Sequence, residues 1–432
     1  MRFDLEEVAR ATGGRLVGDA VSVSGVSIDS RDINGPQLFV PIVAERDGHD
    51  FIPGAISAGA VAVLSAGPAA DVPHVLVDDT TAALQRLGAH ARTRLPGAVI
   101  GITGSVGKTT TKDLLAAVLG GDRPTHASLR SFNNELGVPL TLVNAPEDTA
   151  AAVIEMGARG IGHIRALCNI AKPTVGVVLA VGAAHTELFG DLDGVMAAKG
   201  ELPESLPSSG TAVLNADDHR VMAMTARTDA SVITFGEGGD VSAANVVLDD
   251  TLRPRFELRT PAGAVAVHLK AAGLHAVTNA CAAAAAAVAL EVDPATIADG
   301  LGSADISPWR MSVERTSGGA VVINDAYNAN PLSMHAAIDA LLAVPASRRV
   351  AVIGRMAELG AEGPDEHRAV GRRLAEAGVE VVGFAVPEYG GTTVESIDEA
   401  VGAIGNLGSE TAVLVKASRV AGLERLADAL LG

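Results

Sequence analysis

Long apolar runs alternate with segments of helical periodicity in the middle of the chain. The runs at residues 99–103, 151–155, 174–181 and 211–215 are apolar almost throughout. A strand with one solvated face alternates apolar and polar residues, whereas a continuous apolar run is typical of a strand buried on both faces. These runs therefore predict a mostly parallel sheet that helices cover on both sides.

A second alternation of strands and helices fills the last third of the chain. We predict strands at 321–324, 349–354, 380–385 and 411–416, and helices at 331–343, 364–377 and 421–431. This segment of roughly 120 residues has the size of one doubly wound, Rossmann-like domain. A weak break at 302–308 separates it from an alanine-rich helix predicted at 275–290.

Shorter apolar runs near the N-terminus predict a small α/β unit. Helices are expected at 5–11 and 80–95, and strands at 21–27, 38–40, 60–64 and 75–77. Residues 231–270 are rich in strand formers and short turns, which predicts an antiparallel insertion or edge. We therefore expect an α/β protein of three domains, with boundaries at 1–82, 83–310 and 311–432.

Composition supports this organisation and excludes several functions. The chain has 432 residues, of which 48% are hydrophobic and 3% aromatic, so aliphatic residues must build a large core. Its 33 basic and 51 acidic residues give a net charge of −18, which argues against a protein that coats nucleic acid. Any phosphate chemistry must therefore depend on a few local donors.

Two further features bear on where the chain works. Cys168 and Cys281 form neither a disulfide framework nor a metal-binding spacing, and we expect both in the core. The N-terminus is charged, and the longest apolar stretches, 175–184 and 280–290, are shorter than the roughly 20 residues that span a bilayer. We expect a cytoplasmic protein without stable membrane insertion.

The strongest local motif is G-I-T-G-S-V-G-K-T at residues 101–109, after a predicted strand and before a helix-compatible run at 110–119. Glycines let backbone N–H groups converge on phosphate oxygens, Lys108 can reach the β- and γ-phosphates, and the Thr109 hydroxyl can hold Mg²⁺. The strict phosphate-loop pattern requires glycine where Ile102 stands, so the motif is a variant. An ordinary glycine-rich strand–helix turn is the alternative.

Three single residues follow predicted strands or lie on a helix-compatible segment. Glu155 ends a buried strand, where a carboxylate suits Mg²⁺, although a solvated strand end is an equal alternative. His185 follows another apolar strand, and a lone histidine there is more often structural. Lys199 lies on a helix-compatible segment and would by itself be taken as a solvated lysine.

Amide side chains gather in two other segments. Asn133 and Asn134 precede a Gly-Val-Pro turn, where they could meet a phosphate or cap the helix expected near residue 138. Asn328 and Asn330 follow a predicted strand and precede Pro331, so Asn330 could be only a helix cap. The density of polar groups in both segments favours a site across a cleft.

These motifs together resemble the Mur ligase family. The resemblance rests on the phosphate-loop variant and on N-N-E-L-G-V-P at 133–139, E-M-G at 155–157, A-H-T-E at 184–187, A-K-G-E at 198–201 and Y-N-A-N-P at 327–331. In the N-terminal region, S-I-D-S-R at 27–31 and G-H-D-F at 48–51 resemble the family's uridine-nucleotide-binding domain. The match covers essentially the whole chain.

The resemblance implies a P-loop ATPase-type central domain and specific roles for single residues. The residues implied to bind ATP are Gly104, Ser105, Gly107, Lys108, Thr109, Thr110, Asn279, Arg310 and Asp325. Those implied to bind Mg²⁺ are Thr109, Glu155, His185 and Lys199, the last as an ε-carbamate. Those implied to bind the substrates are Ser30, Arg31, Asn133, Asn134 and Asn328. Those implied to act in catalysis are Lys108, Lys199, His185 and Asn330.

The implied activity is ATP-dependent amide-bond formation through an acyl phosphate. The motifs are most similar to the branch that joins D-alanyl-D-alanine to a UDP-linked muramyl tripeptide. We expect the chain to be a monomer, with a hinge between domains near residues 307–311. The sequence departs from the family pattern at Ala276, Trp309 and Arg355. Two alternatives stay open: a sibling ligase that adds a single amino acid to a muramyl peptide or folate, and an ATPase switch.

Overall fold

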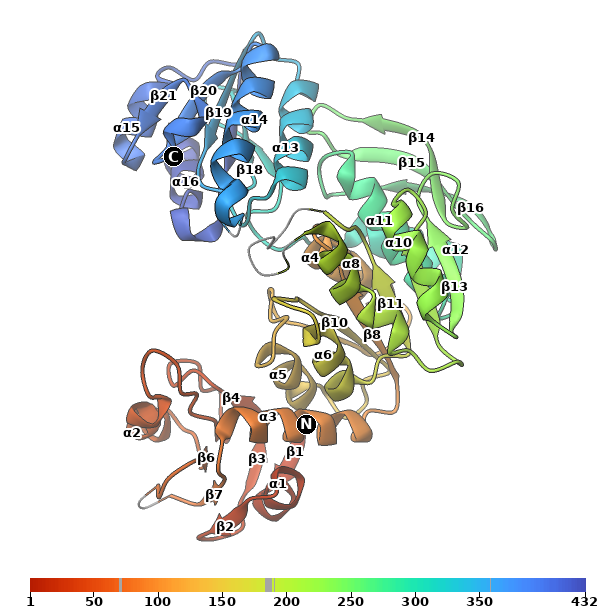
Figure 1. Cartoon of the computed structure of the whole chain (residues 1–432), viewed down its shortest axis with the longest axis vertical. Helices are drawn as coiled ribbons and strands as arrows, with labels where there is room; N and C mark the ends of the chain where they lie inside the picture. The colour runs from red at the N-terminus through yellow and green to blue at the C-terminus, as the bar shows by residue number, and fades with distance from the viewer. Residues whose placement is uncertain (70–71, 183–188, 190, 358) are drawn as a thin grey trace.

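The computed structural model describes residues 1–69, 72–182, 189, 191–357 and 359–432. Three sheet-bearing regions follow one another along the long axis of the molecule, from the N-terminal region through a central region to the C-terminal region (Figure 1). Each of the three main sheets takes its strands from one continuous stretch of the chain. In the described residues, no helix is long and apolar enough to cross a membrane.

The N-terminal region holds a five-stranded sheet in the order β2-β7-β6-β5-β4 and a two-stranded antiparallel pair, β1 and β3. β2 runs antiparallel to β7, and the other neighbours in the five-stranded sheet are parallel. The elements are β1 (Arg2–Asp4), α1 (Leu5–Thr12), β2 (Arg15–Val17), β3 (Ser22–Ser24), β4 (Val26–Ser27), β5 (Leu38–Phe39), α2 (Ile52–Ser57), β6 (Ala62–Ser65) and β7 (His74–Leu76). The predicted small α/β unit is confirmed, with the strand expected at 21–27 divided into two.

The central region is built on a six-stranded parallel sheet in the order β13-β12-β11-β8-β10-β9. Its strands are β8 (Ala98–Thr103), β9 (Thr125–Ala127), β10 (Ala151–Glu155), β11 (Val175–Val178), β12 (Thr211–Asn215) and β13 (Ser231–Phe235). The all-parallel arrangement confirms the prediction from the continuous apolar runs. β11 is shorter than predicted, ending at Val178 rather than at 181.

Helices cover both faces of this sheet, as Figure 1 shows. One core places Ile100 and Val153 beside α4, α11 and α12, and the other places Val99 and Ile154 beside α3, α5 and α6. The helices are α3 (Thr80–Arg94), α4 (Lys108–Gly120), α5 (Gly137–Asn144), α6 (His163–Ala171), α8 (Leu192–Lys199), α9 (Glu201–Glu204), α10 (His219–Met222), α11 (His275–Val288) and α12 (Pro294–Ser303). Cys168 and Cys281 lie in these cores, as expected.

The antiparallel insertion is smaller than predicted. The strands β14 (Ser242–Leu248), β15 (Pro254–Thr260) and β16 (Gly263–His268) form a three-stranded antiparallel sheet. The prediction was wrong for β13, which pairs in parallel with β12 and so belongs to the main sheet. Only residues 242–268 therefore form the insertion.

The C-terminal region is a doubly wound sheet in the order β17-β18-β22-β19-β20-β21, with only β17 antiparallel to its neighbour. Its strands are β17 (Ser312–Arg315), β18 (Val321–Asn324), β19 (Arg348–Ile353), β20 (Glu380–Phe384), β21 (Thr392–Val394) and β22 (Thr411–Lys416). Its helices are α13 (Pro331–Ala343), α14 (Gly363–Glu376), α15 (Ile397–Ile404) and α16 (Glu424–Leu431). The last helix begins three residues later than predicted, after a short 3₁₀ turn at Arg419–Ala421.

The segment between the central and C-terminal regions has an unusual backbone. Trp309 and Met311 both have left-handed φ angles, 60° and 54°, which side chains other than glycine rarely adopt. The Arg419 guanidinium lies 4.4 Å above the Trp309 ring, and the Tyr327 N–H donates to the Trp309 carbonyl at 3.1 Å. Contacts with the C-terminal region thus stabilise this conformation at the predicted hinge.

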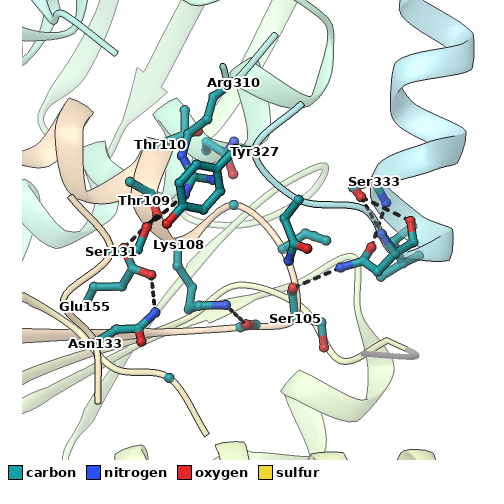
Figure 2. Close-up of a pocket in the computed structure, with 18 of the residues that line it drawn as sticks. Ser105, Lys108, Thr109, Thr110, Ser131, Asn133, Glu155, Arg310, Tyr327 and Ser333 are labelled. Atoms are coloured by element: carbon teal, nitrogen blue, oxygen red, sulfur yellow. Dashed lines mark hydrogen bonds between the residues drawn. The ribbon is translucent and has the colours of Figure 1, made fainter. Parts of the chain in front are cut away.

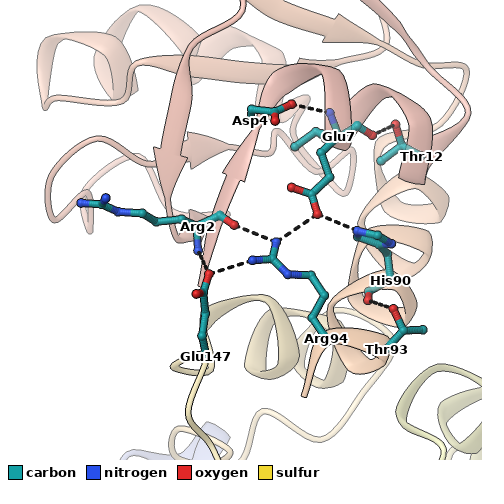
Figure 3. A network of polar contacts seen from close by, with 9 residues as sticks. Arg2, Asp4, Glu7, Thr12, His90, Thr93, Arg94 and Glu147 are labelled. Carbon is teal, nitrogen blue, oxygen red and sulfur yellow. Dashed lines mark hydrogen bonds and ion pairs between the residues drawn. The ribbon is translucent and has the colours of Figure 1, made fainter. Parts of the chain in front are cut away.

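Arg94 joins the N-terminal and central regions, as Figure 3 shows. Its guanidinium donates to the Arg2 carbonyl at 2.8 Å, to Glu7 at 3.0 Å and to Glu147 at 2.7 Å. His90 lies 2.8 Å from the same Glu7 oxygen. One arginine at the end of α3 therefore connects β1 and α1 to the loop after α5.

We predict that Arg94→Ala weakens this connection. Three charge-assisted hydrogen bonds are lost, while Glu7 keeps His90 and Glu147 keeps the Arg2 N–H, so we expect a loss of about 1–2 kcal/mol in the opening free energy of β1 and α1. Native-state hydrogen exchange of their amides measures this quantity. Arg10→Ala is the control, because the one ion pair of Arg10 with a residue that the structure describes is an exposed pair with Glu6 at 3.8 Å. Equal protection in the two variants would contradict the role of Arg94.

Candidate functional site

A cavity of about 370 Å³ lies at the carboxyl edge of the central sheet and extends to the C-terminal region. Figure 2 shows that side chains from the loop before α4, the segment at Ser131, the end of β10 and the loop around Tyr327 meet there. The predicted site residues that line it are Gly104, Ser105, Gly107, Lys108, Thr109, Thr110, Asn133, Asn134, Glu155, Lys199, Asn279, Arg310, Asp325, Asn328 and Asn330. The structure thus brings together residues that are far apart in the sequence.

The loop between β8 and α4 has the form that phosphate binding requires. α4 begins at Lys108, so the N–H groups of its first turn and its positive dipole end face the cavity. The Lys108 ammonium donates to the Gly104 carbonyl at 2.8 Å and so lies across the loop. This arrangement suits the phosphates of a nucleotide.

Gly107 fits this loop for two reasons. Its φ is 83°, in the left-handed region that favours glycine. A Cβ at this position would lie 2.3 Å from the Asn279 side-chain oxygen, so no other residue fits without a shift. The loop therefore packs directly against the buried Asn279 of α11.

Thr109 and Glu155 form the buried centre of the site. The Thr109 hydroxyl donates to one Glu155 carboxylate oxygen at 2.7 Å, and the Asn133 amide donates to the other at 2.7 Å. The Thr109 hydroxyl also lies 3.2 Å from the Ser131 hydroxyl. Glu155 is only 1% exposed, so the alternative of a solvated strand end is wrong.

Lys199 also lines the cavity and is buried, with only 4% of the residue exposed. Burial, and to a smaller extent the nearby positive charge of Lys108, lowers the pKa of Lys199 to about 7. The alternative of a solvated lysine is therefore wrong. An amine with this pKa is partly uncharged near neutral pH and can act as a nucleophile toward CO₂.

Among the described residues, a metal ion would need oxygen ligands of different kinds, such as a hydroxyl and a carboxylate. They contain no group of three or more His, Cys, Asp or Glu side chains arranged for an ion. The Thr109 hydroxyl and the Glu155 carboxylate are adjacent, and both are oxygen donors of the kind that Mg²⁺ prefers. A carbamate on Lys199 would add a further anionic oxygen donor, so these residues fit the ion.

The C-terminal region contributes the opposite wall. Arg310 donates to the Ser131 hydroxyl at 3.0 Å and lies 4.0 Å above the Tyr327 ring, while its buried Nε has no partner among the described residues. Asp325 accepts from the buried Lys416 ammonium at 2.5 Å and from the Met311 N–H at 3.0 Å. Asp325 thus links this wall to the hinge segment.

The two amide segments have mixed roles. Asn134 accepts from the Gly137 N–H at 2.9 Å and so caps α5, whereas Asn133 contacts Glu155. Asn330 caps α13 in a capping box with Ser333, and its amide also approaches the Ser105 carbonyl at 3.5 Å. The capping alternative is therefore confirmed for Asn134 and Asn330, although both also line the cavity.

Three predicted site residues lie elsewhere or cannot be placed. Ser30 and Arg31 belong to the N-terminal region, outside the residues that line the cavity. The Arg31 guanidinium binds Asp29 at 2.7 Å and holds the pKa of Asp29 at about 2. His185 lies outside the described residues.

The sequence reasoning missed Ser131, Lys416 and Glu201. Ser131 connects Thr109 to Arg310, and the buried Lys416 pairs with Asp325. The 1% exposed Glu201 accepts from the Gly162 N–H at 2.5 Å and so caps α6 across 39 residues of sequence. A charged residue that ends an apolar strand was the available signal for Lys416.

Comparisons with known proteins agree with this geometry. Residues 102–287 match the Mur ligase middle domain, and residues 309–423 match the Mur ligase glutamate ligase domain. A Mycobacterium bovis protein named UDP-N-acetylmuramoyl-tripeptide--D-alanyl-D-alanine ligase is 39% identical, with 100% of this chain and 98% of that protein covered.

Two solved structures are also similar. The UDP-N-acetylmuramoylalanyl-D-glutamyl-2,6-diaminopimelate--D-alanyl-D-alanyl ligase from Acinetobacter baumannii has a TM-score of 0.88 and 31% identity, covering 100% of this chain and 98% of that one. The MurF ligase from Thermotoga maritima in complex with ADP has a TM-score of 0.83 and 28% identity, covering 94% and 96%.

We predict that Gly107→Ala weakens ADP binding. The added methyl group strains the left-handed backbone and collides with Asn279, so the affinity should fall by about tenfold or more. Isothermal titration calorimetry with ADP and Mg²⁺ measures it. The matched control is Gly120→Ala at the other end of α4, where a Cβ meets no atom within 4 Å. If Gly107→Ala binds ADP as tightly as Gly120→Ala does, this interpretation of the loop is wrong.

Proposed function

The chain belongs to the Mur ligase family, and from this premise we propose that it joins D-alanyl-D-alanine to a UDP-linked muramyl tripeptide. It is an ATP-dependent ligase that forms an amide bond, with ADP and phosphate as the other products. The observation that carries the proposal is the match, from one end to the other, with ligases named for this reaction.

The peptide carboxylate is a poor electrophile, so the reaction must activate it before an amine can attack. A peptide carboxylate attacks the γ-phosphate of ATP, which gives an acyl phosphate and ADP, and the amine of the dipeptide then displaces phosphate from the activated carbonyl. The chief obstacle is repulsion between the carboxylate and the triphosphate. In a chain of net charge −18, local cations and N–H groups must offset that repulsion.

The loop residues supply the donors for the triphosphate. The N–H groups at the start of α4 face the place where its oxygens would lie, and Lys108 lies across the same loop. Arg310 and Asp325 approach from the C-terminal region, and Asn279 closes the loop from behind. Catalysis on this wall consists of positioning and electrostatic stabilisation.

We infer that Thr109, Glu155, a carbamylated Lys199 and His185 would hold Mg²⁺. When bound, Mg²⁺ supplies the positive charge that neutralises the phosphates. The support for Thr109, Glu155 and Lys199 is that all three are buried and line the same cavity; the proposal for His185 rests on the family resemblance.

The substrates divide among the three regions of the chain in this proposal. The N-terminal region, with Ser30 and Arg31, would hold the uridine nucleotide, and Asn133, Asn134 and Asn328 would contact the peptide substrates. Asn330 would support the phosphate loop through Ser105. We propose a monomer from the family resemblance, and both nucleotide substrates support a cytoplasmic location.

The proposal predicts a specific substrate profile. In a phosphate-release assay, the purified protein should turn over ATP with a UDP-muramyl tripeptide and D-alanyl-D-alanine together, and at less than about 1% of that rate without either peptide substrate. Turnover with free D-alanine but not with the dipeptide would identify a sibling ligase that adds one amino acid. Turnover with ATP alone would identify an ATPase switch.

The carbamate on Lys199 has a test of its own. Lys199→Ala should lose roughly a hundredfold or more in kcat, and short carboxylic acids should restore some of the activity because they supply the missing carboxylate. Lys199→Arg should also be inactive, since a guanidinium keeps the charge but forms no carbamate. Lys270→Ala, which removes an exposed amine paired with Asp305, is the matched control. An active Lys199→Arg variant would exclude the carbamate.

A further inference from the structure

The loop between β10 and α6 brings a further cation to the cavity. Arg159 lines the cavity with Gly157, Ala158 and His163, shortly after Glu155. The Arg159 side chain forms no ion pair with any residue that the structure describes, whereas Arg165 on the same segment pairs with Glu204 at 3.2 Å. Arg159 takes no part in forming the acyl phosphate or the amide bond.

Arg159 is exposed at the cavity, and its guanidinium has no carboxylate partner among the described residues. Acidic residues outnumber basic ones by 51 to 33, so carboxylates are abundant, yet this arginine lines a cavity instead of pairing with one of them. Guanidinium groups bind carboxylates through two parallel N–H donors. The ligand that best matches Arg159 is therefore a carboxylate of a molecule in the cavity.

The backbone on both sides of Arg159 is fixed. The Gly157 N–H donates to the Asn133 carbonyl at 2.8 Å, and a Cβ on Gly157 would lie 2.8 Å from the Asn133 side-chain oxygen. Beyond Arg159, the Glu201 carboxylate accepts from the Gly162 N–H at 2.5 Å and from the Arg165 N–H at 2.9 Å. The loop is therefore held to the segment that carries Asn133 and to the segment that carries Lys199 and Glu201.

The acyl donor of the proposed function has carboxylates that take no part in the reaction. The name of the Acinetobacter baumannii ligase describes a donor peptide that contains a glutamyl and a 2,6-diaminopimelate residue. Each of these residues has two carboxyl groups. One glutamyl carboxyl forms the peptide bond and one diaminopimelate carboxyl reacts, so one carboxylate on each residue remains free.

We propose that Arg159 binds a carboxylate of the acyl donor that does not react, and that it thereby selects the donor peptide. This inference rests on the proposed function. The reacting carboxylate must reach the end of the cavity at Glu155 and Lys108, and Arg159 lines the same cavity four residues after Glu155. Arg159 is a binding and specificity residue; it takes no part in bond making.

The test compares three donors, of which two lack one carboxylate each. The first is the UDP-muramyl tripeptide that ends in diaminopimelate. In the second, lysine replaces diaminopimelate and so removes one carboxylate, and in the third the free glutamyl carboxylate is an amide. Steady-state kinetics with wild type, Arg159→Gln and Arg159→Lys gives kcat and KM for each donor. Arg130→Gln is the matched control, because Arg130 is exposed and does not line the cavity.

Arg159→Gln should raise KM for the first donor by about tenfold to a hundredfold and leave kcat within about threefold. Arg159→Lys should lie between wild type and Arg159→Gln, since it keeps the charge but not the paired donors. The donor that lacks the recognised carboxylate should already be weak with wild type, and Arg159→Gln should weaken it by less than about threefold. Which of the two altered donors behaves in this way identifies the carboxylate that is bound.

Two results would overturn the inference while the proposed function stands. One is an equal loss for all three donors in Arg159→Gln, and the other is equal kcat/KM for the three donors with wild type, which needs no variant to fold. Absence of turnover by wild type with every donor would instead overturn the proposed function and the inference together. ADP titration of each variant confirms that the nucleotide site is intact.

Discussion

The hydrogen bond between Thr109 and Glu155 is the contact on which the rest of the site depends. It exists because β8 and β10 are parallel neighbours, with Glu155 opposite Ile102, so that both strands end at the same edge. The phosphate loop leaves that edge from β8 and returns as α4, which places Thr109 beside Glu155. Asn133 and Ser131 complete this centre from the next segment, and Arg310 reaches it from the C-terminal region. A slip of the strand pairing would separate all of these groups.

Charge explains much of what surrounds this centre. In a chain of net charge −18, anionic substrates would be repelled without a few well-placed cations. Lys108 and Arg310 supply positive charge at the phosphate loop, whereas Lys416 is neutralised by Asp325. Lys199 differs from all of these, because burial and the charge of Lys108 lower its pKa to about 7. The site therefore combines permanent cations with one amine, that of Lys199, which is partly uncharged near neutral pH.

The sequence predicted the features that depend only on contiguous residues, such as single strands and short motifs. Apolar runs predicted strands such as β10, β12, β18 and β22 with the bounds that the structure has, because a strand buried on both faces has no polar interruption. The partner of a strand is not local, which is why β13 was assigned to an antiparallel insertion although it extends the parallel sheet. The site shows the same limit: Glu155 could be proposed from its position at a strand end, whereas Ser131 and Glu201 act through residues distant in sequence.

The connections of the site suggest how binding and chemistry are divided along the chain. Glu201 caps α6 and holds the loop with Arg159 to the helix that carries Lys199, so that these parts of the central region form a single unit. The opposite wall depends on the segment around Trp309, whose left-handed backbone is supported by Arg419 and Tyr327. Asp113 of α4 accepts from the Ser307 N–H at 2.8 Å, at the start of that segment. A nucleotide at the start of α4 would thus be connected to the hinge through one hydrogen bond. Movement of the C-terminal region would therefore shift Asp325 and Asn328 relative to Glu155 and Lys199, which belong to the central region.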